Sequence, residues 1–405
     1  MIGITGMSFL TGIGEFDQHV EEKIFAGEIK IEGCERFEKL GLNSKKASMV
    51  TSFEPKLFDK TSSFLRLPKA YQYAIYVVYK ALIDAGVDME TNKPERIGVF
   101  YATGLAAISD VEKFYKPILS VGLEKGSPIH FPNTTSSVGC GLISIRFNIR
   151  GKNMVISSGG ISGIQAVEIA VMSIQKGEID IAVIVGSDEL TETVYKAYYC
   201  ANMLARDKKG CKEMTRPYAS KNIFGYGTIL GEGAAAIVIE SAESALRRKQ
   251  KFKGIIKGTA CGNNLIKRGN LDGKGSCIVM DYALKRSGMP MIDAVIGSGN
   301  GNYILDKNET VLLKELNKKV GYELSVITPT LLFGETVGAG SILAIICGVL
   351  MIEKQRLIPI KTEEIYESDV KLNTIGEDKL LKNILVNGAS FYGDAASLVL
   401  GNVNT

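Results

Sequence analysis

The stretch Gly151-Lys-Asn-Met-Val-Ile-Ser-Ser-Gly-Gly-Ile-Ser-Gly-Ile-Gln-Ala166 determines how the rest of the sequence is interpreted. It predicts a short apolar strand, Met154 to Ser157, that turns at Gly159 and Gly160 into a helix of small and apolar residues, from about Ile161 to Gln175. The start of such a helix presents unpaired N–H groups and the positive end of the helix dipole, which stabilise an anion. A thiolate nucleophile would be useful there, but the position holds Gly160, which has no side chain.

The composition describes an ordinary globular protein. The chain has 405 residues, 45% of them hydrophobic, which is enough for one large core or two fused medium-sized cores. A formal net charge of +4 is small for this length and gives no reason to expect nucleic acid or an anionic membrane as a partner. The seven cysteines are scattered without a CxxC pair, which predicts reduced thiols and a cytoplasmic protein.

The apolar run Thr336 to Ile352 is the one candidate for a membrane span. It is shorter than the ~20 residues that a span needs and contains three glycines, so we interpret it as a buried core helix. A glycine-bearing turn that leads into a helix of small residues occurs at Gly160 and again at Gly334-Glu335. This repetition predicts a duplicated α/β unit, with one half in residues 1–250, including insertions, and the other in 251–405.

The opening stretch resembles the nucleophile elbow of the β-ketoacyl-acyl carrier protein synthases, the thiolase-fold condensing enzymes, whose pattern is G-P-N-x-x-I-S-T-A-C-A-T-G. The residues that match this pattern in register are Gly151, Asn153, Ile156, Ser157 and Gly163. A second similarity, to the family's R-P-F-D…G-F-x-x-G-E-G-A signature, runs from Arg216 to Ala234, with Tyr218 and Thr228 in place of the two phenylalanines. The resemblance covers nearly the whole chain and implies a thiolase-like duplicated α/β fold of five layers, α-β-α-β-α.

The catalytic positions depart from the family. Its members hold an acyl thioester on cysteine and use two histidines to stabilise the enolate from a malonyl unit. In this chain the cysteine, first histidine, lysine and second histidine positions fall on Gly160, Ser298, Thr330 and Glu335. The two histidines, His19 and His130, both precede the elbow. We therefore expect no Claisen condensation, no activity as an enzyme by itself, and no cofactor or metal.

The family's C-terminal gating loop, N-S-F-G-F-G-G-T-N, falls on residues 387–395. Ser390 and Tyr392 flank Phe391 and stand at glycine positions, which predicts a stiffer loop.

Several residues allow two interpretations. Ser158 or Ser162 is a substitute nucleophile or serves packing and helix N-capping. Glu335, near Asn300, forms a new acid/base site or accepts a structural hydrogen bond. Cys140 is a displaced nucleophile or, as we favour, a buried inert thiol. The basic run 247–253 faces an acidic carrier protein or is a solvated linker, which we favour.

Intact scaffold motifs with changed catalytic positions resemble a chain-length factor, the ketosynthase β subunit of type II polyketide, aryl polyene or specialised fatty acid synthesis. The resemblance implies a heterodimer with a catalytically intact ketosynthase, which brings the acyl carrier protein. By analogy the interface and acyl tunnel include Leu105, Ile108, Val111, Phe114 and Tyr115, together with Met154, Ile156 and Ser158 on a strand that pairs with its mate across the two-fold axis. The alternatives are a repurposed enzyme using Glu335, Ser298 or Asn300 for non-condensing chemistry, and a structural homodimer.

Overall fold

The structure, a computed structural model, describes residues 1–88, 92–208, 210–263, 265–267, 270–271, 273–390 and 392–403. Its strands form one large mixed sheet and three small two-stranded ones. The first half of the chain contributes β1 (Ile2–Thr11), β2 (Gly14–Glu15), β5 (Ile97–Ala102), β6 (Asn153–Ile156), β7 (Ile181–Asp188) and β8 (Gly233–Ser241) to the large sheet. The second half contributes β9 (Gly254–Asn263), β12 (Ala294–Ile296), β13 (Val326–Ile327), β16 (Asn383–Ala389) and β17 (Asp394–Gly401). The small sheets pair β3 (Glu32–Gly33) with β4 (Lys46–Ala47), β10 (Leu265–Lys267) with β11 (Asn270–Leu271), and β14 (Arg356–Leu357) with β15 (Glu377–Asp378).

The strand order repeats. It runs β6-β5-β7-β8-β1 in the first half and β13-β12-β16-β17-β9 in the second, which is the same order when each set is counted along the chain. Within each half, the first two pairings are parallel and the last two antiparallel. The halves meet where β1 and β9 pair through Gly3–Ile4 and Gly254–Ile255. The duplication is therefore confirmed, whereas the boundary between residues 250 and 251 stays a prediction.

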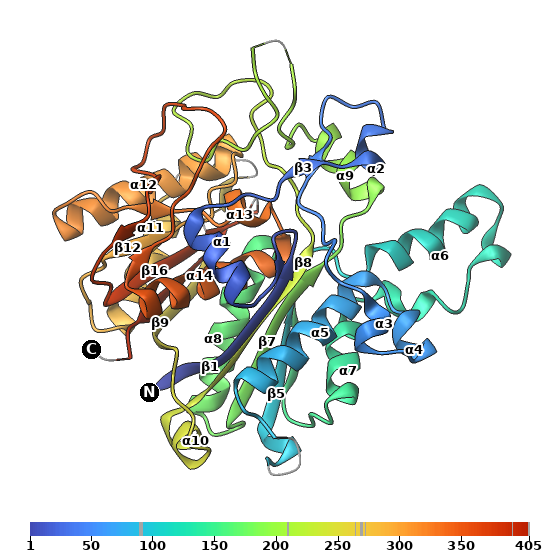
Figure 1. The fold of residues 1–405 in the computed structure, drawn as a ribbon, viewed down its shortest axis with the longest axis horizontal. Coiled ribbons are helices and arrows are strands. Elements are labelled where there is room, and N and C mark those ends of the chain that lie inside the picture. Colours follow the sequence, from blue (N-terminus) through green and yellow to red (C-terminus); the bar gives the residue numbers. More distant parts are fainter. Residues whose placement is uncertain are drawn as a thin grey trace.

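Helices form three layers around the two halves of the sheet (Figure 1). α5 (Lys69–Asp84) and α7 (Ser137–Arg146) cover the first half from outside, and α11 (Lys274–Arg286) with α12 (Tyr303–Val320) covers the second. α8 (Ser162–Gln175) and α14 (Gly340–Lys354) lie between them, since each contacts strands of both halves. This arrangement confirms the predicted five-layer, thiolase-like fold.

The central position of α14 explains its composition. All residues from Ser341 to Ile352 are buried. The segment Val337–Lys354 is long and apolar enough to pass as a membrane span, but 83% of it is buried inside the protein. The predicted core helix is thus present, although α14 begins at Gly340, after a 3-10 turn at Val337–Ala339, rather than at Thr336.

The remaining helices are α1 (Gln18–Ala26), α2 (Glu35–Glu38), α3 (Pro55–Phe58), α4 (Ser62–Leu65), α6 (Ile108–Ser120), α9 (Glu192–Cys200), α10 (Ala242–Arg247) and α13 (Thr330–Phe333). The short α13 belongs to the central core, since Leu331, Leu332 and Phe333 are buried in it. α6 projects from the body of the molecule (Figure 1), and its one buried residue is the acidic Asp110. A helix of 13 residues without a buried apolar side chain is not held by a core of its own.

Candidate functional site

A cavity of about 410 Å³ lies where segments from both halves meet. Its wall takes residues from the elbow at 157–160, from the turn at 297–300 and from 329–337, together with the end of β16, Ser390, Tyr392 and the start of β17. The four substituted positions, Gly160, Ser298, Thr330 and Glu335, all line it. The structure therefore brings together the positions that the resemblance grouped.

The elbow forms as the sequence predicts. β6 ends at Ile156, Gly159 adopts φ 63°, and a 3-10 turn at Gly159–Ile161 leads into α8. The fully buried Ser162 closes the turn: its Oγ accepts the Ser158 N–H at 2.8 Å and donates to the Gly159 carbonyl at 2.7 Å. The Ser162 hydroxyl is thus used within the turn, which agrees with the structural interpretation.

Gly160 leaves open space at the centre of the site. An added Cβ at this position would meet no described heavy atom within 4 Å, apart from its chain neighbours and its own helix backbone. Its φ also lies outside the left-handed region. A side chain could therefore stand at residue 160 without disturbing the elbow.

Glu335 brings a carboxylate to the same wall. Asn300 Nδ2 donates to its Oε2 at 2.8 Å, and the Val337 N–H donates to its Oε1 at 2.9 Å. Burial raises the pKa of Glu335, and the two donors oppose that rise. Burial also raises the pKa of the lining residue Tyr198, and the nearby Glu335 carboxylate adds to the effect. The site therefore holds a carboxyl group that is oriented by two N–H groups and partly shielded from water.

Asp188, which the sequence analysis missed, holds the adjoining wall. Its carboxylate accepts hydrogen bonds from the Thr103 hydroxyl and from the backbone N–H groups of Gly104, Leu105, Ala106 and Gly338, at 2.6–3.0 Å. Burial raises its pKa to about 6 against these five donors. Asp188 thereby joins the loop after β5 to the turn before α14. Its one sequence signal is an acidic residue at the end of a continuous apolar strand.

A second buried acid, Glu309, shapes the turn at 297–300. Its carboxylate accepts from the backbone N–H and the hydroxyl of Ser298 at 3.0 Å, from Asn387 Nδ2 at 2.7 Å and from the Tyr218 hydroxyl at 2.8 Å. The Ser298 hydroxyl is therefore directed away from nucleophilic chemistry and toward Glu309.

Asp306 adds a matching set of bonds from one turn earlier on α12. It accepts the backbone N–H groups of Tyr218, Asn300 and Gly301 at 2.8–3.0 Å. Burial raises its pKa to about 7. Together with Glu309 it determines where Ser298 and Asn300 stand in the cavity wall.

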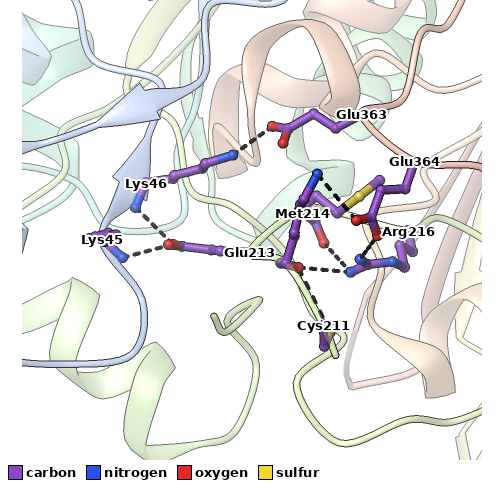
Figure 2. Close-up of polar contacts among 9 residues, drawn as sticks. Lys45, Lys46, Cys211, Glu213, Met214, Arg216, Glu363 and Glu364 are labelled. Atoms are coloured by element: carbon purple, nitrogen blue, oxygen red, sulfur yellow. Dashed lines mark hydrogen bonds and ion pairs between the residues drawn. The ribbon is translucent and has the colours of Figure 1, made fainter. Parts of the chain in front are cut away.

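The start of the signature, at Arg216, is held by polar contacts with other parts of the chain (Figure 2). Arg216 is 3% exposed; it donates to the carbonyls of Lys212 and Met214 and pairs with Glu364 at 3.0 Å. In the same cluster, Glu213 accepts the backbone N–H groups of Lys45 and Lys46 at 2.7 Å. Three segments distant in sequence are thus fastened beside Tyr218.

The other predicted site residues divide into two groups. Leu105, Ser158, Ser390 and Tyr392 line the cavity, and Ile108 packs with Leu105 in a neighbouring apolar cluster. Phe391 lies outside the described residues. Five predicted interface residues are not part of the described cavity lining: Met154 and Ile156 on β6, and Val111, Phe114 and Tyr115 on α6.

The structure bears on two of the open interpretations, those of Cys140 and of the basic run 247–253. Cys140 is buried in α7, and burial raises the pKa of its thiol to about 12, as expected for an inert thiol. In the basic run, Arg248 pairs with the buried Glu240 and donates to the carbonyls of Ala85 and Gly86. The Arg248 side chain therefore has a structural role.

The N-terminal domain of the beta-ketoacyl synthases matches residues 1–245, which is more than half of the chain. The chain belongs to the β-ketoacyl synthase family. Relatives include the 3-oxoacyl-[acyl-carrier-protein] synthase 2 of Coxiella burnetii, 24% identical over 99% of this chain and 98% of the relative, and that of Staphylococcus aureus, 23% identical over 98% and 99%.

Solved structures share the fold. The ishigamide ketosynthase/chain length factor has a TM-score of 0.88 at 22% identity and covers 99% of this chain and 98% of its own. A chain of a type II polyketide synthase complex, AntDE:AntF, described as an acyl-carrier protein with its ketosynthase bound to the hexaketide, has a TM-score of 0.89 at 20% identity, with 99% of both chains covered.

These comparisons correct one expectation. The prediction that the chain is no enzyme by itself is wrong, because the relatives that align over most of its length are named as synthases, which are catalysts. The inference treated four substituted positions as a loss of all activity. Substitutions at a site change which chemical groups it contains, but they do not by themselves remove all activity. This pocket still contains a carboxylate that two N–H groups orient.

Proposed function

We propose that this chain is an acyl-binding ketosynthase-family subunit that acts like a chain-length factor. It pairs with a second ketosynthase subunit in the cytoplasm and shapes the tunnel that receives an acyl chain from an acyl carrier protein. The pathway class is type II polyketide, aryl polyene or specialised fatty acid synthesis. The observation that carries this proposal is a group of exposed apolar side chains at the end of the projecting helix α6 and in the segment that follows it.

That surface, called here the α6 surface, consists of Leu119, Val121, Leu123, Ile129 and Phe131. Leu119 and Leu123 are each 84% exposed, and the others are at least half exposed. Leu119 lies at the end of α6, and the other four residues follow it in the chain. Exposed apolar side chains in a segment without a core of its own indicate a surface that another protein covers. A second subunit is the occupant that explains why α6 is helical where it projects.

The edge strand β6 supports the same assignment. It ends the order of the large sheet and pairs on one side with β5, through Val99 to Ala102. The other edge of β6 presents backbone N–H and C=O groups that another strand can pair with. Met154 and Ile156 lie on this strand, so pairing there would place both at a subunit interface.

The chain also connects the α6 surface to the cavity. Leu105 lines the cavity and is separated from α6 by two residues, and Ile108 begins the helix. A partner that packs on α6 therefore acts on residues that border the acyl site. The ketosynthase/chain length factor and the ketosynthase–carrier protein complex among the structural neighbours are assemblies of the kind proposed here.

The test is co-expression with the ketosynthase paralogue of the same genome, followed by measurement of mass in solution. We expect a heterodimer that Leu119→Glu and Leu123→Glu weaken. Leu246→Glu, at a 78% exposed position on α10, is the matched control and should not weaken pairing. A homodimer alone, or a heterodimer indifferent to both α6 changes, would contradict the proposal. In an active complex, Leu105→Ala should lengthen the product.

The geometry at Glu335 favours a second candidate, an enzyme that uses this carboxyl group for chemistry other than condensation. The raised pKa of Glu335 and its orientation by Asn300 are properties of a general acid or base. The two candidates differ in one result. Glu335→Gln should leave the product of the complex unchanged if Glu335 lies only in a tunnel wall, and abolish turnover if it transfers a proton.

A further inference from the structure

A buried polar side chain in the cavity wall has no hydrogen-bond partner among the residues that the structure describes. Thr336 is 1% exposed and lines the cavity, and its Oγ1 makes no hydrogen bond with any residue that the structure describes. Although Thr336 stands at the N-cap of the 3-10 turn Val337–Ala339, its hydroxyl does not cap that turn. A buried hydroxyl is costly to leave unsatisfied, so its persistence at a cavity points to a ligand that completes it.

Glu335 Oε1 borders the same space. An added Cβ at Gly340 would lie 3.6 Å from Thr336 Oγ1 and 3.8 Å from Glu335 Oε1. These are the only described heavy atoms within 4 Å of that point, apart from chain neighbours and the helix's own backbone. Gly340 also lines the cavity. The absent side chain of Gly340 thus leaves room beside two polar oxygens, and we call this place the Glu335–Thr336 subsite.

Glu335 Oε1 and Thr336 Oγ1 determine which chemical group of a ligand can bind between them. Glu335 Oε1 already accepts the Val337 N–H, and a carboxylate has further lone pairs but no proton to give. The Thr336 hydroxyl can donate to an acceptor. A ligand hydroxyl satisfies both, since it donates to Glu335 and accepts from Thr336. A ketone satisfies only Thr336, a methylene satisfies neither, and a carboxylate is repelled by Glu335.

The geometry points to a subsite for the hydroxyl group of a hydroxyacyl chain bound in the cavity. This inference rests on the proposed acyl-binding function and adds the substrate class. Apolar side chains such as Phe333, Leu343 and Ala344 line the same cavity and suit the hydrocarbon part of the chain. The pantetheine arm of a carrier also has a hydroxyl, so the test must separate the two sources.

The experiment measures binding of amide analogues of acyl-pantetheine to the full chain by calorimetry. The ligands are the octanoyl compound, its 3-, 5- and 7-hydroxy forms, its 3-oxo form and pantetheine alone. At least one hydroxy form should bind about tenfold or more tightly than octanoyl, because a hydrogen bond to a carboxylate discriminates by that order. The 3-oxo form should show no such gain.

Three variants test the residues. Thr336→Val removes the unpartnered hydroxyl, so it should not lower thermal stability, yet it should reduce the preference for the hydroxy form. Gly340→Ala places a methyl group in the subsite at ordinary contact distances and in helical backbone, so it should fold and lose the preference. Thr310→Val is the matched control, since Thr310 is similarly buried, lies outside the described cavity lining and donates its hydroxyl to the Asp306 carbonyl at 2.8 Å, and its preference ratio should stay unchanged.

Equal binding of octanoyl and all hydroxy forms would overturn the inference and leave acyl binding intact, because an ordered water would then fill the subsite. Weaker binding of every ligand, including pantetheine alone, in Thr336→Val would assign the subsite to the pantetheine hydroxyl and also overturn it. No binding of any acyl ligand would refute the acyl-binding function together with the inference. Loss of pairing through the α6 surface would affect the proposed function alone.

Discussion

Replacing Tyr218 by phenylalanine tests whether the buried hydroxyl holds the turn that carries Ser298. The Tyr218 side chain is 1% exposed; its hydroxyl donates to Glu309 at 2.8 Å and accepts the Gly299 N–H at 3.0 Å. The ring lies against the turn so closely that a Cβ at Gly299 would come within 2.4 Å of it. Phenylalanine keeps the ring contact and removes the two hydrogen bonds.

The expected cost follows from those two bonds. A hydrogen bond to a charged group contributes roughly 1.5–3 kcal/mol, and a buried N–H left without a partner costs roughly 1–3 kcal/mol. Tyr218→Phe should therefore lower the free energy of unfolding by about 3–5 kcal/mol. It should also weaken acyl-ligand binding, because Ser298 shares the Glu309 carboxylate with Tyr218.

The assay is urea unfolding monitored with two independent spectroscopic probes. Tyr322→Phe is the matched control. Tyr322 donates one bond, to the Ile292 carbonyl at 2.7 Å, and is 42% exposed, so water replaces part of that bond and the loss should be about 1 kcal/mol. If Tyr218→Phe costs no more than Tyr322→Phe, the hydroxyl does not hold the turn and the reasoning is refuted.

Further predictions concern the elbow and the buried acids. Gly160→Ala should change stability by at most about 0.5 kcal/mol, whereas Gly159→Ala, at φ 63°, should cost about 1–2 kcal/mol; equal effects on the thermal midpoint would contradict the elbow geometry. Asp188→Asn should cost about 3–5 kcal/mol in urea unfolding, because an amide NH₂ would face N–H donors; a loss under about 1 kcal/mol would show that those bonds are dispensable. The pKa of Asp188 is raised to about 6 and that of Asp306 to about 7, so between about pH 4 and 7 the folded protein keeps protons that the unfolded chain has released, and stability should fall as pH rises. Urea titrations across that range check the sign, and a stability that rises with pH would count against it.

Elements with a core face were predictable from the sequence. The helix α8 and the strand β6 before it lie within one residue of the bounds predicted from their small and apolar residues. The α6 residues Ile108, Val111, Phe114 and Tyr115 were predicted only by analogy with the family, without bounds for a helix. α6 is amphipathic, but its apolar side chains meet no buried core in the described chain, so the pattern alone does not say what they contact.

The site was predictable where the resemblance aligned it and not elsewhere. Gly160 and Glu335 were placed in one cavity by their positions in family motifs. Asp188, Asp306 and Glu309 were missed because their partners are backbone N–H groups, which every residue has, from segments far away in the sequence. No spacing or residue type signals such a contact before the chain is folded.

The contrast between kept and changed motif residues has a steric cause. An added Cβ at Gly163 would lie 2.6 Å from Ile342 in the facing helix, and at Gly231 or Gly233 it would lie 2.3 Å from a backbone carbonyl. Close backbone packing requires these glycines, independently of which side chains line the cavity. Gly160 borders free space, so its identity can change at little cost to the fold. The motifs therefore identify the family through packing, while the chemistry of this member depends on side chains that packing does not constrain.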